Sequence, residues 1–399
     1  MAKRIAIVSS SMPPVGAGGV TSAHYNLYRL LKKQGFTVKV YTFGDYQGGV
    51  SEEDVVRFGT PPTITSVIKY LVWLYFKITD PSRMAYNVAG ALLSALPCLR
   101  MNRVISSFQP DVLILPDHGC PGLLISKPKG CQLILISHHN SLRFLGNPLW
   151  GLHSERDAYL TVALENRILK KVDLVVCPSN HMREAFQKTY RYQGPLAVIP
   201  NLVDDELIGS IPANDIRGTL GLREDAILVY IPSAGSVFKG ARFVFEIIRR
   251  LSAYRADAVG FYLSGDIGRE LTYELRFVPP NARIFAPGHL NYHENLSIVK
   301  GCSFGVSPSL IESFGMAILE AIFCNVPMIS FDVGGNTDII SNGKNGFIVP
   351  YLDLEALIEA AYRLMDSNFR ADIRRKMIQF IAHSSNNNVV MEKFLALIQ

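Results

Sequence analysis

The chain has 399 residues, which is long for one hydrophobic core, so we expect two domains of about 200 residues each. With 48% apolar and 19% charged residues it is typical of a soluble α/β protein, and no uninterrupted apolar run reaches the roughly 18 residues that a transmembrane helix needs. Residues 1–200 hold 22 Lys and Arg against 12 Asp and Glu, a charge of +10 that leaves −4 for the rest, so the first half is the better candidate for an anionic partner.

The cysteines and the N-terminus indicate the compartment. The six cysteines are scattered and form no C-x-x-C pair, so we interpret them as buried thiols in a reducing environment rather than disulfides or zinc ligands. The opening MAKRIAIVSS runs from two basic residues straight into a strand, without the apolar segment of a secretory signal. We therefore expect a cytoplasmic protein.

The first predicted unit is a strand, a glycine-rich turn and a helix. Residues 4–9 form a compact apolar run, SSMPPVGAGGV follows, and residues 21–34 have a helical pattern, which is how a Rossmann-like domain begins. The spacing G-A-G-G does not fit G-x-G-x-x-G, so NAD binding is not expected. We interpret Gly16, Gly18 and Gly19 as allowing close backbone approach to a phosphate or an acceptor, the alternative being a tight turn that simply needs glycine.

The next predicted helix, ITSVIKYLVWLYFKI, has two unusual faces. We expect one face to pack on the domain, through Ile64, Val67, Ile68, Leu71, Tyr75 and Ile78. The other face places aromatic residues between lysines, at Lys69, Trp73, Phe76 and Lys77. Residues 57–103 hold six basic residues and one acid, which suits a helix lying on an anionic membrane, peripheral to its inner face. The alternatives are a buried helical hairpin and a dimer interface.

Four apolar runs then alternate with helical segments, which predicts a parallel sheet: VLILP (112–116), LILIS (133–137), LVVCPS (174–179) and LAVIP (196–200). Two of them end in polar residues, Asp117-His118 and His138-His139-Asn140. Ligands of such folds collect beyond the carboxyl ends of the strands, so these histidines mark a binding site. No cysteine or paired acid stands at ligand spacing from them, so no metal is expected.

The second half begins after the polar segment VIPNLVDDELIGSIPAND (198–215), and we place the domain boundary near residue 205. Its predicted strands are ILVYIP (227–232), GFYLSG (260–265), ARIFAPG (282–288), FGVSPS (304–309) and PMISF (327–331). A helix is expected from about Ala241, and the tail from residue 365 to 399 is helical in pattern.

Two acids eight residues apart, Glu312 and Glu320, flank a Ser-Phe-Gly corner. We expect a helix from Gly315 to Phe323 with Ser313 as its N-cap, which would separate the carboxylates by about 12 Å along the axis. Glu312 would then accept hydrogen bonds from sugar hydroxyls and Glu320 from a ribose diol, with a diphosphate at the N–H groups of Phe314, Gly315 and Met316. The alternative is a capped helix with two solvated acids.

The motif ESFGMAILEA resembles the E-x7-E motif of the retaining glycosyltransferases of family 4, which have the GT-B fold. NVPMISFDVGGNTDII, NGKNGFIVP, PPVGAGGV and VIPNLVD resemble further blocks of that family. The resemblance implies an α/β protein with two Rossmann-like domains facing across a cleft. The acceptor-side domain is then residues 1–204 with a last helix, about 385–399, crossing back to it, and the nucleotide-sugar-binding domain is residues 205–384.

The resemblance also implies a site. Three residues match the catalytic positions: Glu312, Lys239 and His139. The donor-binding positions are then Glu320, Ser313, Phe314, Gly315, Met316, Gly18, Gly19, Ser233, Ser236, Arg242, Gly288 and His289. Ala234 stands where the family usually has an Arg, five residues before the Lys. No D-x-D is present, so a metal-independent reaction without cofactor is expected, with retention by front-face attack.

The function implied is transfer of a hexose-type sugar from a UDP- or GDP-linked donor to a lipid-linked glycan or another cell-surface polysaccharide intermediate, with no nucleic-acid partner. Three alternatives stay open: an inactive nucleotide-sugar-binding subunit, which Ala234 would permit, a transferase acting on a soluble acceptor, and a less favoured GT-B sugar epimerase. The sequence does not name the base, the sugar, the acceptor or the oligomeric state.

Overall fold

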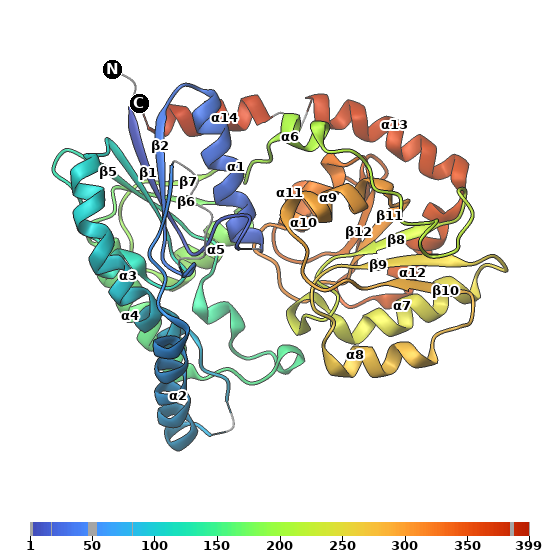
Figure 1. Ribbon diagram of the computed structural model, residues 1–399, viewed down its shortest axis with the longest axis horizontal. Coiled ribbons are helices and arrows are strands. Elements are labelled where there is room, and N and C mark those ends of the chain that lie inside the picture. Colours follow the sequence, from blue (N-terminus) through green and yellow to red (C-terminus); the bar gives the residue numbers. More distant parts are fainter. Residues whose placement is uncertain (1–2, 17, 47–53, 82, 384–386, 399) are drawn as a thin grey trace. The chain divides into compact units, whose positions relative to one another are not determined.

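The computed structural model describes residues 3–16, 18–46, 54–81, 83–383 and 387–398. The chain divides into two compact units (Figure 1). The first consists of Met1–Leu202 together with Met391–Gln399, and the second of Val203–Val390. The division lies beside the predicted boundary near residue 205. The last part of the chain, from Met391, is counted with the first unit.

The first unit is built on a seven-stranded parallel sheet of order β3-β2-β1-β4-β5-β6-β7. Its strands are β1 (Arg4–Ser9), β2 (Thr37–Thr42), β3 (Val55–Arg57), β4 (Val112–Pro116), β5 (Gln132–Ile136), β6 (Leu174–Cys177) and β7 (Leu196–Val198). Central strands are apolar on both faces because helices cover both, so the predicted parallel sheet is confirmed. Strands β2 and β3, which lie at one edge of the sheet, were not predicted from the sequence.

Helices cover both faces of this sheet (Figure 1). They are α1 (Gly19–Lys33), α2 (Pro62–Thr79), α3 (Asn87–Phe108), α4 (Glu155–Leu169), α5 (Asn180–Thr189) and α14 (Asn387–Leu397), with short 3-10 turns at Pro121–Leu123, Ser141–Phe144 and Pro148–Trp150. On one face, residues of α1 and α14 lie with β5 and β6. On the other, residues of α3, α4 and α5 share one hydrophobic cluster with the strands.

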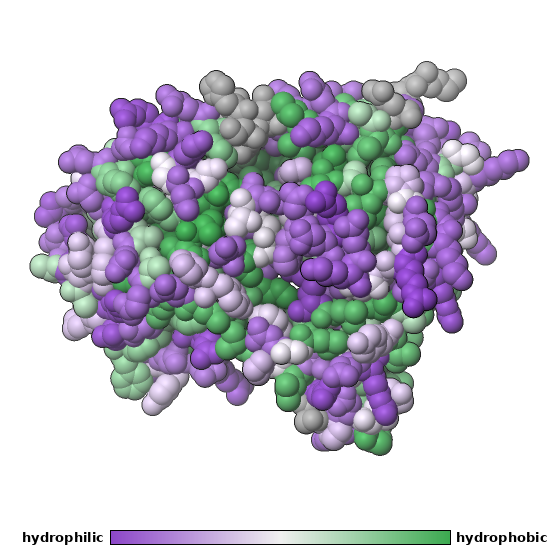
Figure 2. Space-filling model, turned by 180° about the vertical axis from the view of Figure 1, so that it is seen from behind, coloured by the Kyte–Doolittle hydropathy of each residue, from purple (hydrophilic) through white to green (hydrophobic). Residues whose placement is uncertain are grey.

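Helix α2 exposes most of the face that the sequence analysis expected to be buried. Only Val72 and Phe76 are buried, where they pack with Ala89 of α3 and with the partly buried Ile68. The expected packing face is therefore wrong for five of its six residues, which are exposed: Ile64, Val67, Leu71, Tyr75 and Ile78. Apolar side chains occupy most of the circumference of α2, so periodicity alone does not choose a face, and the contact with α3 does. Hydrophobic atoms reach the surface beside hydrophilic ones in the lower lobe of Figure 2, over α2.

Helix α3 is long and apolar enough to cross a membrane by length and composition alone. A third of that apolar window is buried inside the protein. Cys98, Met101 and Ile105 of α3 are almost fully buried in the hydrophobic cluster that also holds strands β1 and β4. These three side chains pack α3 against the sheet of the first unit.

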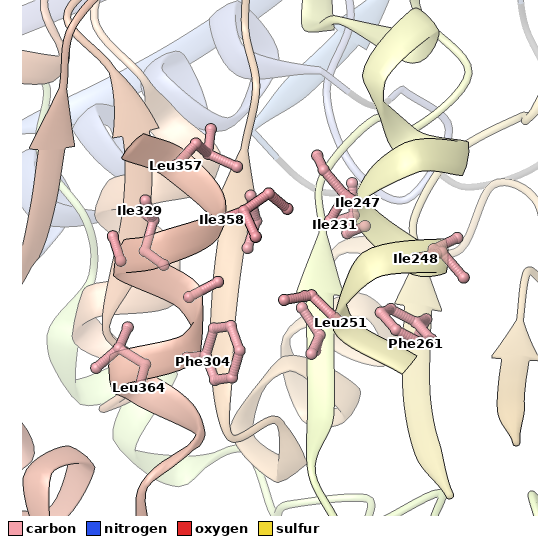
Figure 3. Packing of buried hydrophobic residues seen from close by; sticks show 14 of the residues in the cluster. Ile231, Ile247, Ile248, Leu251, Phe261, Phe304, Ile329, Leu357, Ile358 and Leu364 are labelled. Atoms are coloured by element: carbon pink, nitrogen blue, oxygen red, sulfur yellow. The ribbon is translucent and has the colours of Figure 1, made fainter. Parts of the chain in front are cut away.

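The second unit has a six-stranded parallel sheet of order β10-β9-β8-β11-β12-β13. Its strands are β8 (Leu228–Ile231), β9 (Val259–Leu263), β10 (Ala282–Phe285), β11 (Phe304–Ser307), β12 (Met328–Phe331) and β13 (Gly346–Val349). Its helices are α6 (Asp205–Ser210), α7 (Ala241–Ala253), α8 (Gly268–Glu274), α9 (Tyr292–Gly301), α10 (Met316–Phe323), α11 (Asn336–Ile339), α12 (Leu354–Met365) and α13 (Ser367–His383), with 3-10 turns at Val237–Lys239 and Leu275–Phe277. Figure 3 shows α7 and α12 packing side chains such as Ile247 and Leu357 onto β8, β9, β11 and β12.

A buried ion pair holds the segment that leads into the glycine-rich loop. Arg57, at the end of β3, pairs with Asp45, and both side chains are only 5% exposed. The same carboxylate accepts a hydrogen bond from the N–H of Met12 at 3.0 Å, and the guanidinium donates to the carbonyls of Met12 and Pro13 at 3.2 and 3.1 Å. The pair thus ties β3 and the chain after β2 to the stem of the loop.

Replacing Asp45 with Ala is expected to lower the free energy of unfolding of the first unit by about 3–5 kcal/mol, because it leaves the Arg57 charge buried without its partner. Urea unfolding measures the change. As a control, Asp225→Ala removes an exposed partner of Arg223 and should leave unfolding unchanged. Equal midpoints for Asp45→Ala and Asp225→Ala would contradict this role of the pair.

Candidate active site

Two loops of the second unit meet at the carboxyl edge of its sheet. One follows β8 and carries Lys239, and the other follows β11 and carries Glu312. Strands β8 and β11 are neighbours and run parallel, so both loops leave the sheet at the same edge. This is the edge at which ligands bind in open α/β sheets.

The two loops are joined by hydrogen bonds and by a close backbone approach. The N–H of Leu310 donates to the carbonyl of Phe238 at 2.9 Å. Gly240 has φ of 79°, and a Cβ there would lie 2.0 Å from the carbonyl oxygen of Pro308, so only glycine fits. Lys239 therefore stands where its Nζ lies 2.5 Å from a carboxylate oxygen of Glu312.

The carboxylate of Glu312 is largely enclosed. Its side chain is 13% exposed, whereas that of Lys239 is 32% exposed. The second oxygen of Glu312 accepts the N–H of Ser313 at 3.2 Å. A Cβ on Gly334, which has φ of 58°, would lie 1.9 Å from the carbonyl oxygen of Glu312, so the V-G-G segment after β12 packs directly on its backbone. Three loops thus position this acid, which is not a solvated one.

Helix α10 begins later than predicted. It spans Met316–Phe323, and its N-cap is Gly315, which makes no side-chain cap hydrogen bond. The predicted N-cap, Ser313, is therefore wrong: the chain turns at Gly315, with φ of 105°, against the side-chain oxygen of Asn336, which would lie 2.6 Å from an added Cβ. Because Glu312 lies outside the helix, the estimated axial separation of the two acids does not apply.

The start of α10 leaves backbone donors available. Among the residues that the structure describes, the N–H groups of Phe314, Gly315 and Met316 donate no hydrogen bond. Such groups at a helix N-terminus carry partial positive charge and favour an anion. With Lys239 on the adjoining loop, one edge of the sheet presents a cation and three N–H groups.

Glu320, in the second turn of α10, is only 6% exposed. Burial raises the pKa of the Cys324 thiol to about 12, and the nearby charge of Glu320 adds to this shift. Burial also raises the pKa of Tyr230 on β8, again with a smaller contribution from Glu320. The Glu320 carboxylate is thus enclosed by the second unit, near β8. The alternative of two solvated acids on a capped helix is therefore wrong.

In the first unit, His139 follows β5 at the carboxyl edge of its own sheet. Its backbone N–H donates to Asp117 at 2.8 Å, and its Nε2 lies 2.9 Å from the side-chain oxygen of Asn87. The rings of His118 and Phe144 each lie 5.1 Å from that of His139. Burial lowers the pKa of His139 to about 3, helped by the nearby His118. Its imidazole is therefore neutral at physiological pH.

Two family descriptions match the chain. Residues 17–207 match Glycosyltransferase Family 4, and residues 214–383 match Glycosyl transferases group 1. The chain belongs to the family 4 glycosyltransferases. The family resemblance read from the E-x7-E motif is thereby confirmed.

Individual relatives are distant. The chain is 26% identical over 232 residues to an uncharacterized glycosyltransferase of Methanocaldococcus jannaschii, covering 58% of this chain and 57% of that protein. It is 24% identical over 239 residues to the UDP-Gal:alpha-D-GlcNAc-diphosphoundecaprenol alpha-1,3-galactosyltransferase of Escherichia coli, covering 54% and 55%. The matches thus span about half the length of these relatives. The solved structure of Anabaena HepE in complex with UDP and glucose has a TM-score of 0.69 at 17% identity over 99% of each chain, which confirms the GT-B fold.

In this family 4 glycosyltransferase, the other predicted donor residues lie along the same edge of the second sheet. Ser233 is exposed, and its N–H donates to the side chain of Ser264, after β9, at 3.1 Å. Gly265 bridges to Gly288, beyond β10, next to the exposed His289. The Ser236 carbonyl accepts the N–H of Lys239 at 2.9 Å. The guanidinium of the exposed Arg242 lies 5.6 Å from the ring of Phe243 on its own helix.

Ala234 is part of the hydrophobic core. Its side chain is 0% exposed, and it lies in the cluster that contains Ile231 and Val244. A guanidinium at this position would have to be buried in that cluster, which is costly without a partner. No cation therefore stands at position 234, where the family usually has a phosphate-binding Arg. Lys239 is the cation of this loop.

The predicted glycines of the first unit lie where α1 begins. Gly18 has φ of 118° and precedes α1 as its N-cap, and Gly19 is the first residue of the helix. A Cβ on Gly18 would meet no atom within 4 Å, so its backbone conformation rather than crowding requires glycine.

The remaining histidines do not form a metal site. Nε2 of His138 lies 3.1 Å from the side-chain oxygen of Asn201, and its ring lies 5.6 Å from that of His24 on α1, away from His139. Across the described ranges, no group of three or more His, Cys, Asp or Glu side chains has the arrangement of a metal site.

Sequence reasoning missed two residues beside His139. Asn87 begins α3 and Asp157 lies in the first turn of α4, yet both join the hydrogen bonds around the imidazole. Neither stands in a motif or beside a strand end, so no sequence signal marked them. Only the packing of α3 on α4 brings them to His139.

Proposed function

We propose that the chain transfers a hexose-type sugar from a nucleotide-diphosphate sugar to an acceptor hydroxyl, with retention of anomeric configuration and without a metal. The observation that carries this is the Lys239–Glu312 pair beside the free N–H groups at the start of α10. Breaking the bond between sugar and phosphate releases a diphosphate, and positive groups placed around it stabilise that developing charge.

Each residue of the edge then has a role. Lys239 and the N–H groups of Phe314, Gly315 and Met316 hold the diphosphate, and Glu312 accepts hydrogen bonds from hydroxyls of the transferred sugar. Glu320 accepts from the ribose diol. In the transfer step the bond from the anomeric carbon to phosphate oxygen breaks and the bond to the acceptor oxygen forms. The acceptor proton passes to the leaving phosphate, so no protein base is assigned.

The donor is a UDP- or GDP-linked sugar. Two similarities support this choice: the HepE structure holds UDP and glucose, and the Escherichia coli relative is named for UDP-Gal. Thermal shift against a panel of nucleotide sugars tests it, because a ligand that binds the folded state raises the midpoint by mass action. Release of nucleoside diphosphate then separates an enzyme from an inactive nucleotide-sugar-binding subunit. A stabilising donor that is never turned over with any acceptor or water would favour the subunit, which the buried Ala234 permits.

Substitutions of Glu320 and Glu312 are expected to affect different kinetic constants. Glu320→Ala is expected to weaken donor binding about tenfold, because a hydrogen bond to a charged group contributes about 1.5–3 kcal/mol. Glu312→Ala should lower turnover more than donor affinity, because it contacts the sugar whose bond breaks. Donor titrations and initial rates measure both. Unchanged kinetics for the two variants would rule out the proposed site.

We also propose that the acceptor is lipid-linked and that α2 docks on an anionic membrane from the cytoplasmic face. Eight large apolar or aromatic side chains of this one helix are exposed: Ile64, Val67, Tyr70, Leu71, Trp73, Leu74, Tyr75 and Ile78. Monomeric soluble proteins rarely expose so continuous an apolar surface without a partner. Phe76, which the sequence analysis assigned to this contact, is buried and has no part in it.

Cations accompany the apolar surface. Lys69 and Lys77 of α2 are exposed, and the Lys77 ammonium lies 4.4 Å from the ring centroid of Trp73. Arg100 and Arg103 of α3 are exposed as well. Within the described part of the chain, none of the four forms an ion pair. Lysines above aromatic rings suit the boundary between headgroups and acyl chains of anionic lipids, which favours a membrane over a dimer or a soluble acceptor.

A further inference from the structure

We propose that Asn87 and Asp157 are positioning residues that hold His139 in the tautomer with the proton on Nε2, so that its Nδ1 accepts a hydrogen bond from a substrate hydroxyl. The proposal rests on the proposed function for the identity of the substrate, and on the hydrogen bonds of the first unit for the tautomer. It assigns a role to two residues that lie outside every motif of the sequence.

Asp157 orients the Asn87 amide. Asp157 is 1% exposed, and every partner of its carboxylate is an N–H donor. It accepts from the backbone N–H groups of Tyr86 at 3.2 Å, Asn87 at 3.0 Å and Val88 at 2.8 Å, and from the side-chain NH2 of Asn87 at 2.8 Å. The amide NH2 must therefore face Asp157, because two acceptors could not share that contact.

The orientation of the Asn87 amide in turn determines which nitrogen of the imidazole carries the proton. With its NH2 on Asp157, Asn87 presents its side-chain oxygen to Nε2 of His139 at 2.9 Å. An amide oxygen only accepts, so Nε2 carries the proton and donates. In a neutral ring Nδ1 then has a lone pair, and it makes no hydrogen bond within the described residues.

The rest of the surroundings keep the ring neutral. One oxygen of Asp117 accepts the backbone N–H of His139 and the hydroxyl of Ser137, and neither oxygen is hydrogen-bonded to the imidazole. Its charge raises the pKa of His139, but burial, the largest cause, outweighs it. Burial and the neighbouring His118, Arg143 and His153 all lower the pKa of His139. A neutral Nδ1 recognises a hydroxyl, and it offers no charge to a phosphate. The contact it makes is therefore with a hydroxyl group of a substrate rather than with a phosphate.

Long-range ¹H–¹⁵N correlation spectra of protein labelled with ¹⁵N-histidine test the tautomer directly. The His139 signals, assigned by their loss in His139→Gln, should show a protonated Nε2 and an unprotonated Nδ1 from pH 6 to 8. In Asn87→Leu they should shift toward an average of the two tautomers. A protonated Nδ1 or an imidazolium in the wild-type protein at pH 7 overturns the proposal, whether or not any donor is turned over.

Kinetics give the second readout. Asn87→Leu should lower kcat about tenfold, the value of one hydrogen bond, while affinity for nucleoside diphosphate stays within about twofold. Asn102→Leu is the matched control, because Asn102 makes two hydrogen bonds from the same helix to Leu124 and Ser126, away from His139. Equal kcat for wild type and Asn87→Leu overturns the positioning role. A fall in kcat for both variants would assign the effect to α3 as a whole and also overturn it.

Discussion

Replacing Lys239 with Ala is expected to lower kcat of sugar transfer about 100- to 1000-fold, the usual effect of removing one group that stabilises charge developing in the transition state. Lys239 is the only cation between Ser233 and Gly240, in the loop after β8. Its Nζ lies 2.5 Å from Glu312, which is in the loop that leads into α10. In the proposed function the same ammonium would contact the bound diphosphate and offset part of its charge.

The substitution should also weaken binding of nucleoside diphosphate about 10- to 100-fold, because one charge-assisted contact is lost. Calorimetric titration and initial rates measure the two effects. Lys344→Ala removes an exposed lysine of the same unit that the proposed site does not use, and should change neither. A Lys239→Ala enzyme that keeps wild-type kcat would show that the diphosphate binds elsewhere.

Wild-type protein is expected to sediment with liposomes that contain anionic lipid, and a variant of the exposed face of α2 is expected to remain in the supernatant. The variant combines Leu71→Ser, Trp73→Ser and Ile78→Ser with Lys69→Glu and Lys77→Glu. Each buried large apolar side chain contributes about 1.5–3 kcal/mol and each lysine about 1 kcal/mol near an anionic surface, so partitioning should fall by well over tenfold. Because Phe76 and Val72 are left in place, the contact with α3 is retained.

A matched control comes from the second unit. Tyr273 and Phe277 are also exposed, and the guanidinium of Arg276 lies 5.9 Å from the ring of Tyr273. The variant Tyr273→Ser, Phe277→Ser with Arg276→Glu should sediment like wild type. If wild type ignores anionic liposomes at low salt, or forms a dimer that only the α2 variant abolishes, the membrane proposal fails and α2 is an interface between copies of the chain.

Most of the strands and the two charged residues of the site were predictable from sequence, whereas β2, β3 and β13 were not predicted. Runs such as VLILP and ILVYIP are apolar without interruption because helices cover both faces of each sheet, and that pattern does not depend on the details of packing. Lys239 and Glu312 each follow such a run, so their meeting at one edge follows from the parallel order of β8 and β11. The sequence, through its motifs, was therefore sufficient for the family and for the place of the candidate site.

Local patterns failed wherever a second contact decided the outcome. Ser313 is a good N-cap by residue type, yet α10 begins after Gly315 because the chain turns against Asn336 at the start of α11. Helix α2 is apolar around most of its circumference, so only its contact with Ala89 of α3 determines which residues are buried.

The sequence by itself determined most strands of the two parallel sheets, the strand ends that lead to Lys239, Glu312 and His139, and the family to which the chain belongs, because each follows from residues adjacent along the chain. Only the tertiary structure decided which face of α2 is exposed and how His139 is held. The hydrogen bonds that Asn87 donates to Asp157 and accepts from the imidazole join residues 70 and 52 positions apart, and no periodicity within one helix or strand records such contacts.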